Sequence, residues 1–135
     1  MKRIILMDDS EIFLEVARRA LVQAGYEVIT ANDLESFQKA REQKPADLVL
    51  MDVQMPEAFG DDIAMTLVFA HDVVTPIYLL SSLNDQELKA RAREAGIDGF
   101  ISKNIGIDRI VEQVRRILDP AELPPPDNPA DRSRG

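Results

Sequence analysis

The sequence contains no cysteine, which excludes disulfide frameworks, thiolate metal sites and cysteine nucleophiles. It also has no apolar run near the roughly 18 residues that a membrane-spanning helix needs. The N-terminal segment MKRIILMDDSEIF places two acids directly after a short apolar run, which is not the pattern of a secretory signal. We therefore expect a cytoplasmic protein that does not associate with membranes.

Basic side chains are outnumbered, with 16 Lys and Arg against 24 Asp and Glu, and the formal net charge is −8. A negative charge of this size argues against direct binding to nucleic acid or to an anionic membrane surface. The 135 residues are 45% hydrophobic and 30% charged, which is the balance of one soluble globular domain.

Proline is sparse until the C-terminal segment, which begins at Pro120 and contains most of the eight prolines. Its one large apolar residue, Leu123, cannot bury enough surface to offset the entropy of the chain. We predict a domain over residues 1–119 and a Pro-rich disordered tail or linker over 120–135. A tether to another module and a frayed terminus explain this composition equally well.

Short apolar runs rich in β-forming residues alternate with longer segments of helical periodicity. The predicted strands are Arg3–Met7, Tyr26–Thr30, Asp47–Met51, Pro76–Leu80 and Gly99–Ile101. Two apolar helical stripes are clear: Phe13, Val16, Ala17, Ala20, Leu21 and Ala24, and then Ile107, Ile110, Val111, Val114, Ile117 and Leu118. Candidate N-caps are Ser10, Asn32 (with Glu35) and Asn84 (with Glu87), and Gly25 and Gly96 fit helix C-termini.

Strands that alternate with helices pair in parallel through right-handed crossovers. The runs DLVLMD and PIYLLS are continuously apolar, as in strands that are covered on both faces. The sequence therefore predicts an α/β fold, a flavodoxin-like (βα)5 doubly wound sandwich with a five-stranded parallel sheet of order 2-1-3-4-5.

Acidic residues follow two of the predicted strands. Asp8 and Asp9 come directly after the first strand, and Asp52 follows the third. In a doubly wound sheet of this order, ligands bind at the carboxyl ends of the strands where the winding reverses, between strands one and three. A single acid there would be an ordinary cap or surface residue, but three of them repel one another unless a cation joins them. Hard oxygen ligands of this kind suit Mg²⁺.

Two further polar residues belong to the same edge of the predicted sheet. Ser81 ends the fourth strand and Lys103 follows the fifth. The ammonium group can balance the carboxylates and contact a phosphoryl oxygen, and the hydroxyl group can donate to another.

Four stretches together carry a specific resemblance: ILMDDS, LVLMDVQMP followed by Gly60, PIYLLSS and GIDGFISK. Over about residues 2–119 the chain resembles the response-regulator receiver domain of two-component signalling, the family that includes the chemotaxis regulators. The resemblance implies a cytoplasmic phosphoacceptor of bacterial type rather than an enzyme with a separate substrate. Its chemistry would be limited to its own phosphorylation and dephosphorylation.

The resemblance also implies roles for individual residues. Asp52 would accept a phosphoryl group from a phosphohistidine of a sensor histidine kinase or phosphotransfer protein. Mg²⁺ or Mn²⁺ would be held by Asp8, Asp9, Asp52 and the backbone carbonyl of Gln54. Lys103 would contact the phosphoryl group.

Switching in the family couples a strand-four hydroxyl to a strand-five aromatic residue, here Ser81 and Phe100. Two positions depart from the usual pattern. Phe100 lacks the hydroxyl of the frequent tyrosine, so an inward ring would be held by packing alone. Asn104 stands where the family usually has proline after the lysine. We predict a trans Lys103–Asn104 bond, since a cis bond before a non-proline residue costs about 2.5–4 kcal/mol.

Other function classes fit less well. A phosphatase of the haloacid-dehalogenase type needs a second Asp two residues after the first, whereas Ser10 and Glu11 occupy those positions. A flavin or nucleotide carrier needs a Gly-rich or hydroxyl-rich phosphate loop where MDDSEIF is acidic. The alternative that remains is a receiver-like interaction module that works without phosphorylation.

The expected output is a protein contact. We predict that a downstream target binds the face formed by the fourth helix, the fifth strand and the fifth helix. Its charged residues would be Asp85, Lys89, Arg93 and Arg109. These mixed charges show no strong dimer signature and leave a homodimer open.

Overall fold

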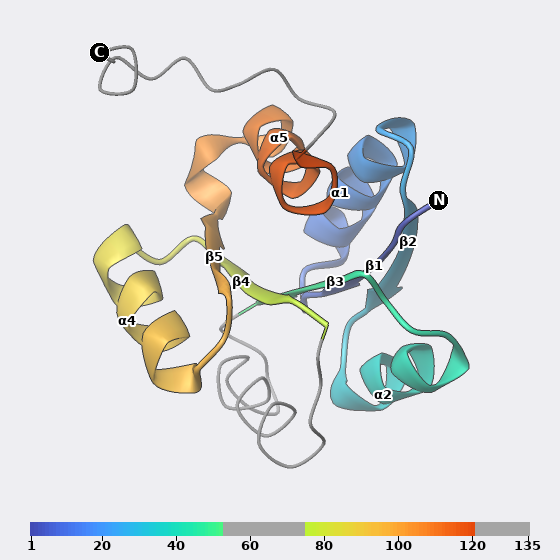
Figure 1. The fold of residues 1–135 in the computed structure, drawn as a ribbon, viewed down its shortest axis with the longest axis horizontal. Coiled ribbons are helices and arrows are strands. Elements are labelled where there is room, and N and C mark those ends of the chain that lie inside the picture. Colours follow the sequence, from blue (N-terminus) through green and yellow to red (C-terminus); the bar gives the residue numbers. More distant parts are fainter. Residues whose placement is uncertain (53–74, 121–135) are drawn as a thin grey trace.

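The computed structural model describes residues 1–52 and 75–120, and a five-stranded parallel sheet forms its centre (Figure 1). The strands are β1 (Arg3–Met7), β2 (Glu27–Ala31), β3 (Leu48–Asp52), β4 (Ile77–Ser81) and β5 (Gly99–Ser102). They lie in the order β2-β1-β3-β4-β5, and all four pairings are parallel. The predicted sheet and its order are confirmed.

Four α-helices lie within the described residues. They are α1 (Glu11–Gln23), α2 (Leu34–Gln43), α4 (Asp85–Ala95) and α5 (Ile107–Leu118), and a 3₁₀ turn, η1 (Lys103–Ile105), joins β5 to α5. The helix predicted between β3 and β4 lies outside the described residues, as do Gln54 and the Pro-rich segment from residue 121 onward.

Alternate residues of the strands point to opposite faces of the sheet, which divides the core. Ile4 and Leu6 join the cluster under α1 and α5, whereas Ile5 and Met7 join the cluster under α2. Leu79 of β4 packs with Leu88 and Ala92 of α4 in a third cluster. Figure 1 shows α1 and α5 together on one side of the sheet and α2 on the other. Burial on both faces explains why the strands are continuously apolar.

The apolar stripe predicted for α5 is confirmed, with Ile110, Val114 and Leu118 buried. The stripe predicted for α1 is partly wrong. Leu14 is buried in place of Val16, whose side chain is 48% exposed. The buried face of α1 follows Leu14, Ala17 and Leu21, so the helix is rotated from the prediction by part of a turn.

The predicted caps of α1 and α4 are confirmed, because Ser10 Oγ accepts from Phe13 N and Asn84 Oδ1 accepts from Glu87 N. The predicted Asn32–Glu35 box is wrong. Asp33 caps α2 instead, and its carboxylate accepts from the backbone N–H and the hydroxyl of Ser36.

Glycines end two of these helices. Gly96 caps α4 in the left-handed conformation (φ 70°), and Gly25, also at positive φ, follows the capping residue of α1. A positive φ is accessible to glycine without the cost that a Cβ brings.

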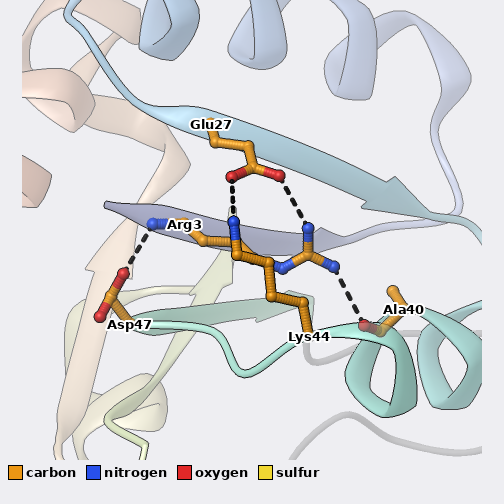
Figure 2. Close-up of polar contacts among 5 residues, drawn as sticks. All are labelled: Arg3, Glu27, Ala40, Lys44 and Asp47. Atoms are coloured by element: carbon orange, nitrogen blue, oxygen red, sulfur yellow. Dashed lines mark hydrogen bonds and ion pairs between the residues drawn. The ribbon is translucent and has the colours of Figure 1, made fainter. Parts of the chain in front are cut away.

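A buried arginine connects three elements at the edge of the sheet opposite the acids (Figure 2). Arg3 is 4% exposed, and its guanidinium donates to Glu27 of β2 at 2.9 Å and to the carbonyl of Ala40 in α2 at 3.0 Å. Its backbone N–H donates to Asp47 at 2.7 Å, and Lys44 reaches the same Glu27 carboxylate at 3.2 Å. No pattern in the sequence predicts this network.

Candidate functional site

The register of the sheet brings the predicted acids together. Met7 of β1 lies opposite Met51 of β3, so the next residues, Asp8 and Asp52, emerge side by side. One carboxylate oxygen from each of Asp8, Asp9 and Asp52 lies within 4.8 Å of the others. Asp8 is fully buried, Asp52 is 6% exposed and Asp9 is exposed. The cluster therefore has two sheltered carboxylates and one that faces solvent.

Lys103 reaches this cluster from the turn after β5. Its ammonium forms ion pairs with the carboxylates of Asp8 and of Asp52, the second at 3.7 Å. The same nitrogen lies 4.3 Å from the centroid of the Phe13 ring on α1, which is cation–π distance. The sequence predicted Lys103 beside the acids but not its contact with Phe13.

Ser81 occupies the position predicted for it. Its neighbour Leu80 lies opposite Asp52 in the sheet, so the hydroxyl belongs to the same edge as the acids. The residue is 2% exposed, and its Oγ accepts a hydrogen bond from the backbone N–H of Leu83 at 3.2 Å. A hydroxyl that accepts in this way still has its O–H to donate.

The charge balance of the site fits a divalent cation. Three carboxylates against one ammonium leave a formal charge of −2. One oxygen of Asp8 accepts from the backbone N–H of Ser10 at 2.9 Å, while the other is buried without a hydrogen bond and contacts Lys103. Oxygen donors with this charge suit Mg²⁺ or Mn²⁺, so the residues present fit the predicted metal. The further ligand predicted at Gln54 falls outside the described residues.

Phe100 is partly buried on β5 and packs against the cluster of Leu79, Leu88 and Ala92.

The Lys103–Asn104 peptide bond is trans, as predicted. The side-chain amide of Asn104 donates to the carbonyl of Ser82 at 3.1 Å, a contact that sequence reasoning missed. Only the tertiary structure brings these residues together, since they are 22 positions apart.

The four charged residues predicted for the output face are all exposed to solvent. Asp85, Lys89 and Arg93 lie on α4, and Arg109 lies on α5. Within the described ranges, none of the helices is long and apolar enough to cross a membrane.

Comparison with known proteins agrees with this fold and identifies the family. Residues 4–115 match the model of the response regulator receiver domain, and the chain belongs to that family. A curated relative is the polar-differentiation response regulator DivK of Brucella anthropi. It is 33% identical over 125 residues, which cover 89% of this chain and 98% of DivK.

Solved structures of the family superpose along most of the chain. The chemotaxis protein CheY4 of Vibrio cholerae matches with a TM-score of 0.78 and 25% identity, over 87% of this chain and 99% of CheY4. The BeF3-activated receiver domain of DrrB matches with a TM-score of 0.75 and 27% identity, over 88% of this chain and 98% of that domain.

Proposed function

We propose that this receiver domain accepts a phosphoryl group on Asp52 from a phosphohistidine of a sensor histidine kinase or phosphotransfer protein. The observation that carries the proposal is the cluster of Asp8, Asp9 and Asp52 with Lys103 at the carboxyl edge of the sheet. Three carboxylates at one point repel one another and so destabilise the fold, which argues that they serve a function other than stability.

The proposed step is an in-line displacement at phosphorus. A carboxylate oxygen of Asp52 forms the new bond to phosphorus, and the bond between phosphorus and the imidazole nitrogen of the donor breaks. The electron pair of that bond stays on the nitrogen. Asp52 is nearly buried, so the product acyl phosphate would be sheltered from bulk water.

The neighbouring residues would stabilise the charge of the phosphoryl group. The Lys103 ammonium already faces Asp52 and would pair with one phosphoryl oxygen. The hydroxyl of Ser81 would donate to another after a small movement of the loop that follows β4. Asp8 and Asp9 would hold Mg²⁺ or Mn²⁺ with Asp52, and the metal, when bound, would supply charge neutralisation at the phosphoryl oxygens.

The domain would act as a signalling phosphoacceptor and not as an enzyme that turns over a separate substrate. Phosphorylation would move the Ser81 hydroxyl and the Phe100 ring and thereby change the face of α4, β5 and α5. A downstream protein would bind there in the cytoplasm. The exposed mixed charges of that face support an output by protein contact.

Intact-mass analysis tests the phosphoacceptor. With Mg²⁺ and acetyl phosphate, we expect the wild-type protein and Asp108→Asn, an exposed acid of α5, to gain one phosphoryl group. Asp52→Ala and Asp52→Asn should gain none. Phosphorylation of Asp52→Asn to the wild-type extent would contradict the assignment.

If the wild-type protein gains no mass, beryllofluoride binding is measured next. Binding that requires Asp52 would support the site and show that only the small donor is refused. Failure of both measurements would favour the phosphorylation-independent interaction module.

A further inference from the structure

The contacts of Lys103 lie at the end of a long side chain. The ammonium contacts Asp8, Asp52 and the ring of Phe13, and only 19% of the side chain is exposed. A lysine side chain has four rotatable bonds, so these contacts restrain its tip and leave the position of its backbone to the turn that carries it. That backbone belongs to η1, a single 3₁₀ turn.

Asn104 makes two hydrogen bonds that fix this turn. Its backbone N–H donates to Ser102 Oγ at 3.1 Å, which caps η1 at its start. Its side-chain amide donates to the carbonyl of Ser82 at 3.1 Å. The first bond is local, whereas the second joins η1 to the loop after β4.

Ser82 lies within the segment that carries the proposed switch hydroxyl. It follows Ser81 directly, and the next residue, Leu83, donates its backbone N–H to Ser81 Oγ. The carbonyl of Ser82 and the N–H of Leu83 belong to one peptide unit. The Asn104 amide therefore bonds to the same peptide unit that holds the Ser81 hydroxyl.

We propose that Asn104 is a positioning residue that ties the turn bearing Lys103 to the Ser81–Ser82 loop, so that the two phosphoryl-contacting groups move as one unit. The inference rests on the proposed function of Asp52 and Lys103. A displacement of Ser81 toward a phosphoryl oxygen carries the Ser82 carbonyl with it, and the bond transmits that displacement to η1. Asn104 in this way supplies through its side chain the restraint on Lys103 that a proline ring would supply at the same position.

The test is a double-mutant cycle between Asn104→Ala and Lys103→Ala, measured as the rate of phosphorylation by acetyl phosphate and as beryllofluoride affinity. Because Asn104→Ala removes one exposed hydrogen bond, we expect it to lower the phosphorylation rate and the beryllofluoride affinity roughly two- to tenfold in the wild-type background. In the Lys103→Ala background the same substitution should have no further effect. An equal loss in both backgrounds would show a merely structural role and overturn the proposal.

Asn32→Ala is the matched control, because Asn32 is an exposed asparagine that follows β2 at the same edge of the sheet. It should leave both measurements unchanged. Asn104→Gln keeps the amide donor and should recover part of the loss. A loss in Asn104→Gln as large as in Asn104→Ala would contradict the role of the amide.

A nuclear magnetic resonance readout keeps the inference separate from the proposed function. In the wild-type protein the Lys103 ammonium should give a distinct signal, because carboxylates hold it. Asn104→Ala should broaden that signal and shift the Leu83 amide, and Asn32→Ala should do neither. If the wild-type protein is not phosphorylated, the proposed function fails, but these signals still test whether Asn104 positions Lys103 and the loop after β4. Unchanged Lys103 and Leu83 signals in Asn104→Ala would refute it.

Discussion

Asp8 and Asp9 are adjacent in the chain and differ in their surroundings. Asp8 is buried, accepts from the N–H of Ser10 and contacts Lys103. Asp9 is exposed, and no ion pair of Asp9 with a basic side chain occurs within the described residues. Among the three carboxylates, Asp9 therefore carries the negative charge that basic side chains neutralise least, since Lys103 already offsets part of the charge of the other two.

Magnesium should stabilise the folded protein through Asp9. We expect Mg²⁺ to raise the melting temperature, with about 2.7 kcal/mol of stabilisation when its concentration is a hundred times the dissociation constant. Asp9→Asn should lose most of this gain, because it removes one of three charges that attract the cation. Without metal the same variant should be more stable than wild type, because it relieves repulsion within the cluster.

Differential scanning calorimetry with and without Mg²⁺ measures both effects. Asp108→Asn on α5 is the control and should respond to Mg²⁺ as the wild-type protein does. Equal metal responses of Asp9→Asn and wild type would argue against a metal site at the cluster.

The sequence predicted the positions of five site residues because each follows or ends a strand. Parallel strands bring their carboxyl ends to one edge, so Asp8, Asp9, Asp52, Ser81 and Lys103 had to approach one another. The contacts that Phe13 and Asn104 make at the site were not predicted. Their contacts depend on the rotation of α1 and on the path of the loop after β4, which strand and helix periodicity do not determine.

At the scale of the element, two asparagines with the same predicted role differ in the structure. Asn84 caps α4, and its side chain accepts from Glu87 N at 2.9 Å. Asn32 lies one residue before the true cap of α2, Asp33. We expect Asn84→Ala to lower the free energy of unfolding by about 1 kcal/mol, and Asn32→Ala by a few tenths at most.

Urea unfolding monitored by circular dichroism measures both asparagine variants under one set of conditions. The slopes of the transitions should match that of the wild-type protein, because neither substitution alters the buried surface. Equal losses in the two variants would mean that the cap of α4 contributes no specific stability.

The helix periodicities explain why α5 was predicted well and α1 less well. In α5 the apolar residues form one stripe with charged residues on the opposite side. In α1 the apolar residues extend around the helix: Leu14 is buried, whereas Ile12 and Val16 are exposed. Several stripes fit such a sequence, and only packing against the sheet and α5 selects Leu14, Ala17 and Leu21.

At the scale of the whole molecule, the order of strands and helices was sufficient to predict the sheet, because right-handed crossovers allow few arrangements. The network of Arg3 at the opposite edge was not predictable. Its partners are Glu27 of β2, the backbone carbonyl of Ala40 in α2 and Asp47 just before β3. The two acids look like ordinary surface charges in the sequence, and a backbone carbonyl leaves no signal there. Arg3 is buried because three elements converge on its guanidinium and backbone N–H (Figure 2).

This network makes stability depend on pH through Glu27. Hydrogen bonding from Lys44 lowers the pKa of Glu27 below its ordinary value of 4.5, and Arg3 adds to the effect while partial burial opposes it. A carboxyl with a lowered pKa in the folded state stabilises the protein fully above its unfolded value. That stabilisation is lost as the pH falls through the lower, folded value.

Glu27→Gln should therefore be less stable than wild type at pH 7. The difference should begin to shrink below about pH 4.5, where the unfolded state becomes protonated, and should vanish below the lower pKa of the folded state, where both states are protonated. Lys44→Met tests the same link from the other partner. By removing the strongest cause of the shift it should bring the folded pKa of Glu27 closer to 4.5 and reduce the acid dependence in part. Urea unfolding from pH 7 to pH 3 measures these differences, with the charged side chains of α1 left intact in every variant. If the difference in the free energy of unfolding between Glu27→Gln and wild type stays constant over this range, the carboxylate contributes through packing and not through its charge. The ion pairs of Glu27 would then add no stability of their own.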